Sequence, residues 1–78
     1  MNIALLRQYW REAPYYLRRE LHNFTRYPEV GHNKGYIVGY LAALHDTQQL
    51  GDDAYRFWLI YSNYPHPEVL DLYKQGNK

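Results

Sequence analysis

Apolar residues recur at intervals of three and four positions almost throughout the chain, which is the spacing of amphipathic helices. Alternation of apolar and polar residues, the pattern of a strand, never persists. Prolines and glycines interrupt the apolar runs at positions that start or stop helices. The pattern predicts an all-α fold, a compact small bundle of four to five short helices that forms one domain over residues 1–78.

The first part of the chain predicts two helices. Asn2 is the expected N-cap of a helix that ends near Glu12, and Pro14 suits the first turn of a second helix that reaches about Thr25. The apolar side of the first helix comprises Ile3, Leu6 and Trp10, and that of the second comprises Leu17, Leu21 and Phe24. One helix kinked at Pro14 would also satisfy the pattern.

The segment GYIVGYLAAL, residues 35–44, predicts a third helix for which Asn33 is the expected cap. Gly35, Gly39 and Ala43 recur at every fourth position and form a row of small residues. Because a glycine in a helix interior costs about 0.5–1 kcal/mol, we expect this row to admit a closely packed neighbour. If Gly35 falls in the first turn, only Gly39 needs that explanation. Ten uncharged residues are too few to span a membrane.

Two further helices are expected in the second half. Gly51 would end the third helix and Asp52 would cap the fourth, which is apolar on nearly every side. A last helix is expected from about Pro67 to Tyr73, with residues 74–78 frayed. The expected core comprises Trp10, Leu17, Leu21, Phe24, Ile37, Leu41, Leu44, Phe57, Trp58 and either Val69 or Leu70.

The amino-acid composition excludes several kinds of active and binding site. The chain has no cysteine, so it can form neither a disulfide nor a thiolate metal site, and its four histidines lie on different predicted elements without helical metal-ligand spacing. Ser62, the only serine, lacks the glycine context of a catalytic nucleophile, and no phosphate-binding glycine motif occurs. We therefore expect no enzyme activity, no catalytic residue, no metal and no cofactor.

Aromatic and basic residues concentrate in the first half of the chain. The ten tyrosines are too many for a core of this size, so several rings must be exposed. Residues 1–34 carry six Lys and Arg against three acidic residues, whereas residues 35–78 carry three against five. The candidate partner-binding residues are Arg11, Tyr15, Arg18, Arg19 and Arg26.

Three interpretations of these residues stay open. Arginine and tyrosine dominate protein-binding hot spots, and the same pair suits stacking on bases and contact with phosphates. Alternatively, the arginines only cover the core or pair with Glu12 and Glu20. The net charge of +1 favours a protein partner over nucleic acid, and self-association through exposed tyrosines would give a homo-oligomer. The alternative partner-binding set is acidic and comprises Asp52, Asp53, Glu68 and Asp71.

The segment GYIVGYLAALHDTQQLGDDAYRFWL, residues 35–59, resembles the helix–short turn–helix element of very small phage and prophage proteins. The resemblance implies an inhibitor or adaptor of host machinery, a group that includes anti-CRISPR proteins, and it transfers no residue roles. Arg7 interrupts the N-terminal apolar run before a signal peptide could form. A cytoplasmic location is the corresponding expectation.

Overall fold

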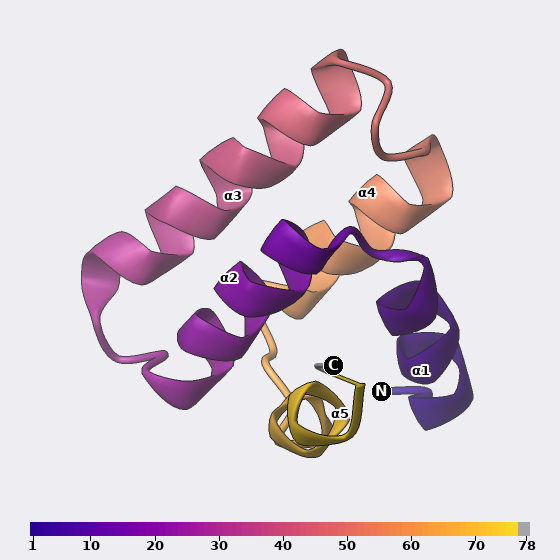
Figure 1. Ribbon diagram of the computed structural model, residues 1–78. Helices are drawn as coiled ribbons and strands as arrows, with labels where there is room; N and C mark the ends of the chain where they lie inside the picture. Colours follow the sequence, from indigo (N-terminus) through magenta and orange to yellow (C-terminus); the bar gives the residue numbers. More distant parts are fainter. Residues whose placement is uncertain (77–78) are drawn as a thin grey trace.

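The computed structural model describes residues 1–76 and contains five helices and no strand within that range (Figure 1). The helices are α1 (Ile3–Glu12), α2 (Tyr15–Arg26), α3 (Gly31–Asp46), α4 (Asp52–Tyr61) and α5 (Glu68–Gly76). Helix α2 packs against both α3 and α5, α3 packs against α4, and α1 packs against α5. The predicted all-α small bundle is confirmed.

Two separate helices form at the start of the chain, as the first of the two alternatives predicted. Asn2 caps α1, since its side-chain oxygen accepts a hydrogen bond from the backbone N–H of Leu5 at 3.2 Å. Ala13 and Pro14 adopt extended conformations, and Pro14 stands at the N-cap of α2. The chain therefore turns sharply between α1 and α2 instead of continuing through a kink.

Helices α3 and α4 begin differently from the sequence prediction. Helix α3 starts at Gly31 with Val30 at its N-cap, so Asn33 is not the cap. The Asn33 side chain lies in the first turn and donates to the Tyr27 carbonyl at 3.2 Å, which satisfies it locally. Asp52 is the first residue of α4 and Gly51 occupies the cap position. The Asp52 carboxylate instead accepts a hydrogen bond from the His45 imidazole, and no side chain within residues 1–76 caps α4.

The ends of α3 and α5 also correct the prediction. Helix α3 closes at Gln48, whose φ of 61° is the left-handed conformation of a helix terminator, and the N–H of Gln49 donates to the Leu44 carbonyl at 2.8 Å. Gly51 therefore does not end it. Helix α5 continues through residues 74–76, which were expected to fray, while residues 77–78 lie outside the described range.

The predicted core is largely confirmed. Nine of the expected residues are buried, with Val69 buried and Leu70 only partly so, whereas Phe57 is partly buried at the edge. Its ring stacks on Tyr9 at a centroid distance of 4.7 Å and meets Trp58 edge to face at 5.0 Å, but it also lines a surface groove, which leaves it partly exposed. The core also includes residues absent from the prediction: Leu6, Ala13, Leu50, Ala54 and Tyr61.

The row of small residues on α3 faces solvent, so the predicted close packing at Gly39 is wrong. Gly35, Gly39 and Ala43 are exposed, and a Cβ placed on either glycine would meet no atom of another element within 4 Å. The physical reason is the position of the apolar stripe: α3 buries Ile37 and Leu41 on its other side. No helix within residues 1–76 is long and apolar enough to cross a membrane.

Candidate binding surface

Helix α2 has a buried side and an exposed side that differ sharply. Leu17, Leu21 and Phe24 are buried in the core. The exposed side carries the residues that we call the α2 outer face: Tyr15, Tyr16, Arg19, Arg26 and Tyr27. Three of the five predicted site residues, Tyr15, Arg19 and Arg26, belong to it. Tyr16 and Tyr27, which the prediction omitted, stand beside them.

Side chains of the α2 outer face pack on one another. The rings of Tyr15 and Tyr16 meet edge to face at 5.7 Å, and the Arg19 guanidinium lies 5.4 Å from the Tyr16 ring centre. The Arg26 guanidinium lies 5.2 Å from the ring centre of Tyr27. Tyr15 and Tyr16 nevertheless remain 51% and 61% exposed. The α2 outer face therefore presents exposed aromatic rings and two arginine charges, and the contacts among these side chains hold them partly in place.

Glu20 moderates the positive charge of this face. Its carboxylate lies 3.5 Å from the Arg19 guanidinium. Burial raises the pKa of the Tyr40 hydroxyl on neighbouring α3, and the Glu20 charge raises it further. Because Glu20 acts on groups of both helices, the seam between α2 and α3 is less basic than the arginines alone would make it.

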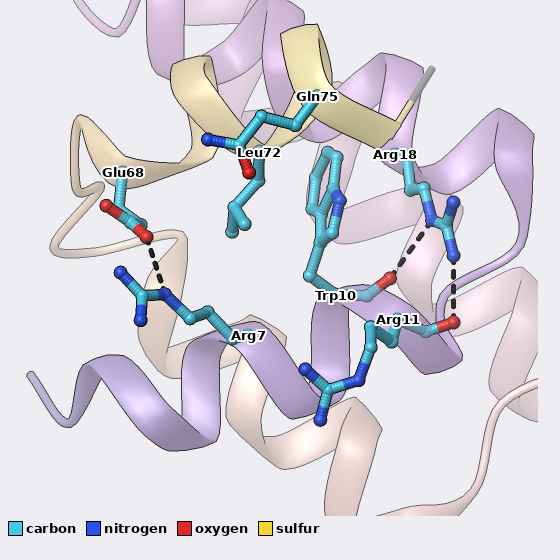
Figure 2. Close-up of a pocket in the computed structure, with 7 residues that line it drawn as sticks. All are labelled: Arg7, Trp10, Arg11, Arg18, Glu68, Leu72 and Gln75. Atoms are coloured by element: carbon cyan, nitrogen blue, oxygen red, sulfur yellow. Dashed lines mark hydrogen bonds and ion pairs between the residues drawn. The ribbon is translucent and has the colours of Figure 1, made fainter. Parts of the chain in front are cut away.

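Arg11 and Arg18, the other two predicted residues, line a cleft between α1, α2 and α5 of about 540 Å³ (Figure 2). The lining residues are Arg7, Trp10, Arg11, Arg18, Glu68, Leu72 and Gln75. We call this the arginine cleft. The five predicted residues are therefore divided between two neighbouring surfaces.

Arg18 has a structural role in the arginine cleft. Its Nε donates to the Trp10 carbonyl at 3.0 Å, and a terminal nitrogen donates to the Arg11 carbonyl at 2.8 Å (Figure 2). These carbonyls belong to the last turn of α1, where backbone acceptors lack N–H partners four residues on, although the Trp10 carbonyl also accepts from the Ala13 N–H at 3.2 Å. The Arg18 guanidinium also lies 5.8 Å from the centre of the Trp10 ring. Arg18 thereby fastens α2 to the end of α1.

The remaining arginines of the cleft differ in their partners. Arg7 Nε pairs with the Glu68 carboxylate at 2.8 Å, which joins α1 to α5. The Arg11 side chain has no hydrogen bond or ion pair with the residues described, and Figure 2 shows it directed away from the carbonyls that Arg18 binds. Arg11 is thus the guanidinium of the cleft that is available for a carboxylate or phosphate. The i, i+4 spacing of Arg7 and Arg11 in the sequence could have identified Arg7.

The four residues of the acidic alternative do not gather on one face. Glu68 lies in the arginine cleft, whereas Asp52 and Asp53 line a hollow beside Glu12 at the start of α4. The start of α4 is well separated from α5, which carries Glu68 and Asp71 (Figure 1). The hydrogen bond from His45, 2.5 Å long, lowers the pKa of Asp52. Within residues 1–76, no group of three or more His, Asp or Glu could hold a metal ion.

An apolar groove, which the sequence reasoning missed, lies between α1 and α4. It encloses about 350 Å³ and is lined by Met1, Asn2, Leu5, Phe57, Ile60 and Tyr64. Ile60 is 60% exposed and Tyr64 is 73% exposed. The available signal was the position of Leu5, which lies off the apolar stripe of α1. Exposed apolar clusters of this kind are typical of surfaces that contact other proteins.

Comparisons with known proteins add no further identification. No protein family, curated protein or solved structure that was compared with the chain matches it.

Proposed function

We propose that this protein is a non-enzymatic protein-binding module that contacts its partner through the α2 outer face. The observation that carries the proposal is the exposure of Tyr15, Tyr16 and Arg19 on the side of α2 opposite the core. The fold gains little from large rings in water, whereas rings and guanidinium groups contribute most to binding energy at protein interfaces. In keeping with the resemblance to small phage proteins, we propose an inhibitor or adaptor role.

A protein partner suits this surface better than nucleic acid. Two arginines of the adjoining arginine cleft are already engaged, Arg18 with backbone carbonyls and Arg7 with Glu68. Glu20 offsets part of the Arg19 charge. Few free cations remain to neutralise successive phosphates, which supply most of the affinity in nucleic-acid binding. The apolar groove between α1 and α4 offers a second contact for a protein and none for a phosphate backbone.

A capture experiment with paired variants tests the proposal. The tagged protein is incubated with a bacterial lysate, with and without nuclease, and the bound fraction is identified. Arg19→Glu combined with Arg26→Glu should weaken capture about tenfold or more, while the melting temperature changes little because both residues are exposed. Arg56→Glu, at an exposed position of α4, is the matched control and should bind like the unaltered protein.

Two results would contradict the proposal. Undiminished capture by the double variant would exclude the α2 outer face as the contact. A bound fraction that disappears after nuclease treatment and at raised salt would assign the surface to nucleic acid instead.

A further inference from the structure

The solvent face of α3 is a helix face that no other described element covers. It comprises His32, Gly35, Tyr36, Gly39, Ala43 and Asp46, all of them exposed. Tyr36 is 60% exposed, and the space above Gly35 and Gly39 is open, since a Cβ at either position would meet no other element within 4 Å. Between Lys34 and Asp46 the face has no charged side chain. It is therefore uncharged in the middle and polar at both ends.

The polar ends are placed symmetrically about Gly39. His32 lies seven residues before Gly39 and Asp46 lies seven residues after it. Seven residues are two helical turns, about 10 Å along the axis, and they return a side chain to within about 20° of the starting direction. An imidazole and a carboxylate therefore stand at equal distances from Gly39 and point to the same side as it does.

We propose that this face binds the same face of a second copy of the chain, with the two α3 helices antiparallel and a two-fold axis at Gly39. In this arrangement His32 lies opposite the partner's Asp46, and the contact occurs twice. An imidazole N–H donates to a carboxylate, so the two ends are mutually complementary, as a two-fold interface requires. A parallel pair would place the carboxylates of Asp46 against each other, which is unfavourable.

The middle of the face favours close approach of the two helices. Gly35 would lie opposite the partner's Ala43, and the absence of large side chains at these positions lets the backbones come near. Tyr36 would lie on the same flank as the partner's Ala43 and lose its exposure to water. A single helix of 16 residues covers less area than the roughly 1,200–2,000 Å² of a standard interface, so we expect a weak dimer with a Kd between about 1 μM and 1 mM. The inference goes beyond the proposed function, because it uses α3 and leaves the α2 outer face free.

Sedimentation equilibrium up to about 1 mM protein tests the interface with two lysine variants. Gly39→Lys places like charges against each other at the two-fold axis and should weaken association about tenfold or more. Its fold should persist because Gly39 is exposed with open space above it, and circular dichroism melting checks this. Ala4→Lys introduces the same charge at an exposed position of α1 and should associate like the unaltered protein. An unaltered protein that stays monomeric at about 1 mM, or a Gly39→Lys variant that dimerises normally, would overturn the proposal.

A charge exchange tests the antiparallel orientation itself. His32→Glu alone should weaken the dimer, since the introduced carboxylate would oppose the partner's Asp46. Combining His32→Glu with Asp46→Lys should restore association, because each introduced glutamate then faces the lysine introduced in the other copy. Both changes suit the helix dipole, which favours acidic residues at the N-terminus and basic residues at the C-terminus, so the variants should fold. Failure of the double variant to recover the dimer would refute the antiparallel pairing.

Discussion

Helices α2 and α3 pack on each other through similar apolar sides, yet their solvent faces differ. The outer face of α2 carries Tyr15, Arg19 and Arg26, whereas the exposed middle of α3 has no charge between Lys34 and Asp46. The core requires leucine, isoleucine and phenylalanine on the inner sides and places no comparable demand on the outer ones. Some side chains are unfavourable or uncommon in contact with water. Where they occur on the outer side of a helix, they indicate a binding surface.

The two faces also predict different kinds of contact. Arginine pairs with carboxylates through directed hydrogen bonds, and at an exposed surface this attraction weakens with salt. The uncharged middle of α3 interacts by close packing, which salt screening leaves unaffected, and Asp46 is the one carboxylate that each copy brings to the contact. Raised salt should therefore weaken partner binding at α2 more than self-association at α3. Substitutions on the two helices distinguish residues that support the fold from residues that are available for binding.

Among these variants, replacement of Arg18 should have the largest effect on stability. Arg18→Met removes two hydrogen bonds to the last turn of α1 and the cover over Trp10, so we expect a loss of about 1–3 kcal/mol in the free energy of unfolding. Arg19→Met is the matched control on the outer face and should change it by about 0.5 kcal/mol or less. Urea denaturation measures both. Equal losses of stability would show that Arg18 and Arg19 support the fold to the same extent.

Gly39→Ala should stabilise the monomer. The added methyl group meets no neighbouring element, and alanine is favoured over glycine in a helix by about 0.5–1 kcal/mol. Ala43→Gly, at an exposed position on the same face, is the reciprocal control and should destabilise by a similar amount. Thermal melts at low protein concentration, where dimers are absent, make the comparison. If Gly39→Ala destabilises the protein instead, another part of the chain packs closely on Gly39, as the sequence predicted.

The sequence predicted the helices and most of the core because burial imposes a period that can be read along the chain. The apolar stripes of α1 and α2 are examples, and Leu17, Leu21 and Phe24 are all buried. It could not reveal which side of α3 is covered, since glycine, alanine and tyrosine occur both in cores and on surfaces. The prediction that Gly39 packs against a neighbouring element was wrong for this reason.

Among the arginines, the sequence could identify the pairing of Arg19 with Glu20, but not the partners of Arg18 or Arg7. The separation of Arg18 from Arg19 follows from helix geometry, which directs adjacent side chains about 100° apart. Which of them turns inward depends on where the last turn of α1 lies, and that is a tertiary property. The pairing of Arg7 with Glu68 joins residues 61 positions apart, so no local pattern could predict it.

The smallest effect is expected from acid, at the edge of α2 that faces α5. His22 stacks on Tyr73 at a centroid distance of 4.2 Å. Burial lowers the pKa of His22, and this effect, together with the nearby Arg26 charge, outweighs the hydrogen bond with Asn23, which raises it. The unfolded chain therefore binds a proton more readily than the folded one, so stability falls as the pH decreases below the ordinary value of 6.5 and is unaffected above it.

The His22 contribution can be isolated by comparing melting temperatures of the unaltered protein and His22→Gln between about pH 7.5 and pH 5.5. The variant should lose less stability on acidification, and the difference should be small because His22 is only partly buried. A nuclear magnetic resonance titration of the imidazole gives an independent measure, with a midpoint expected below 6.5. A midpoint above that value would mean that the stacking of His22 on Tyr73 favours the charged ring. Equal acid sensitivity of the two proteins would mean that folding leaves the pKa of His22 unchanged.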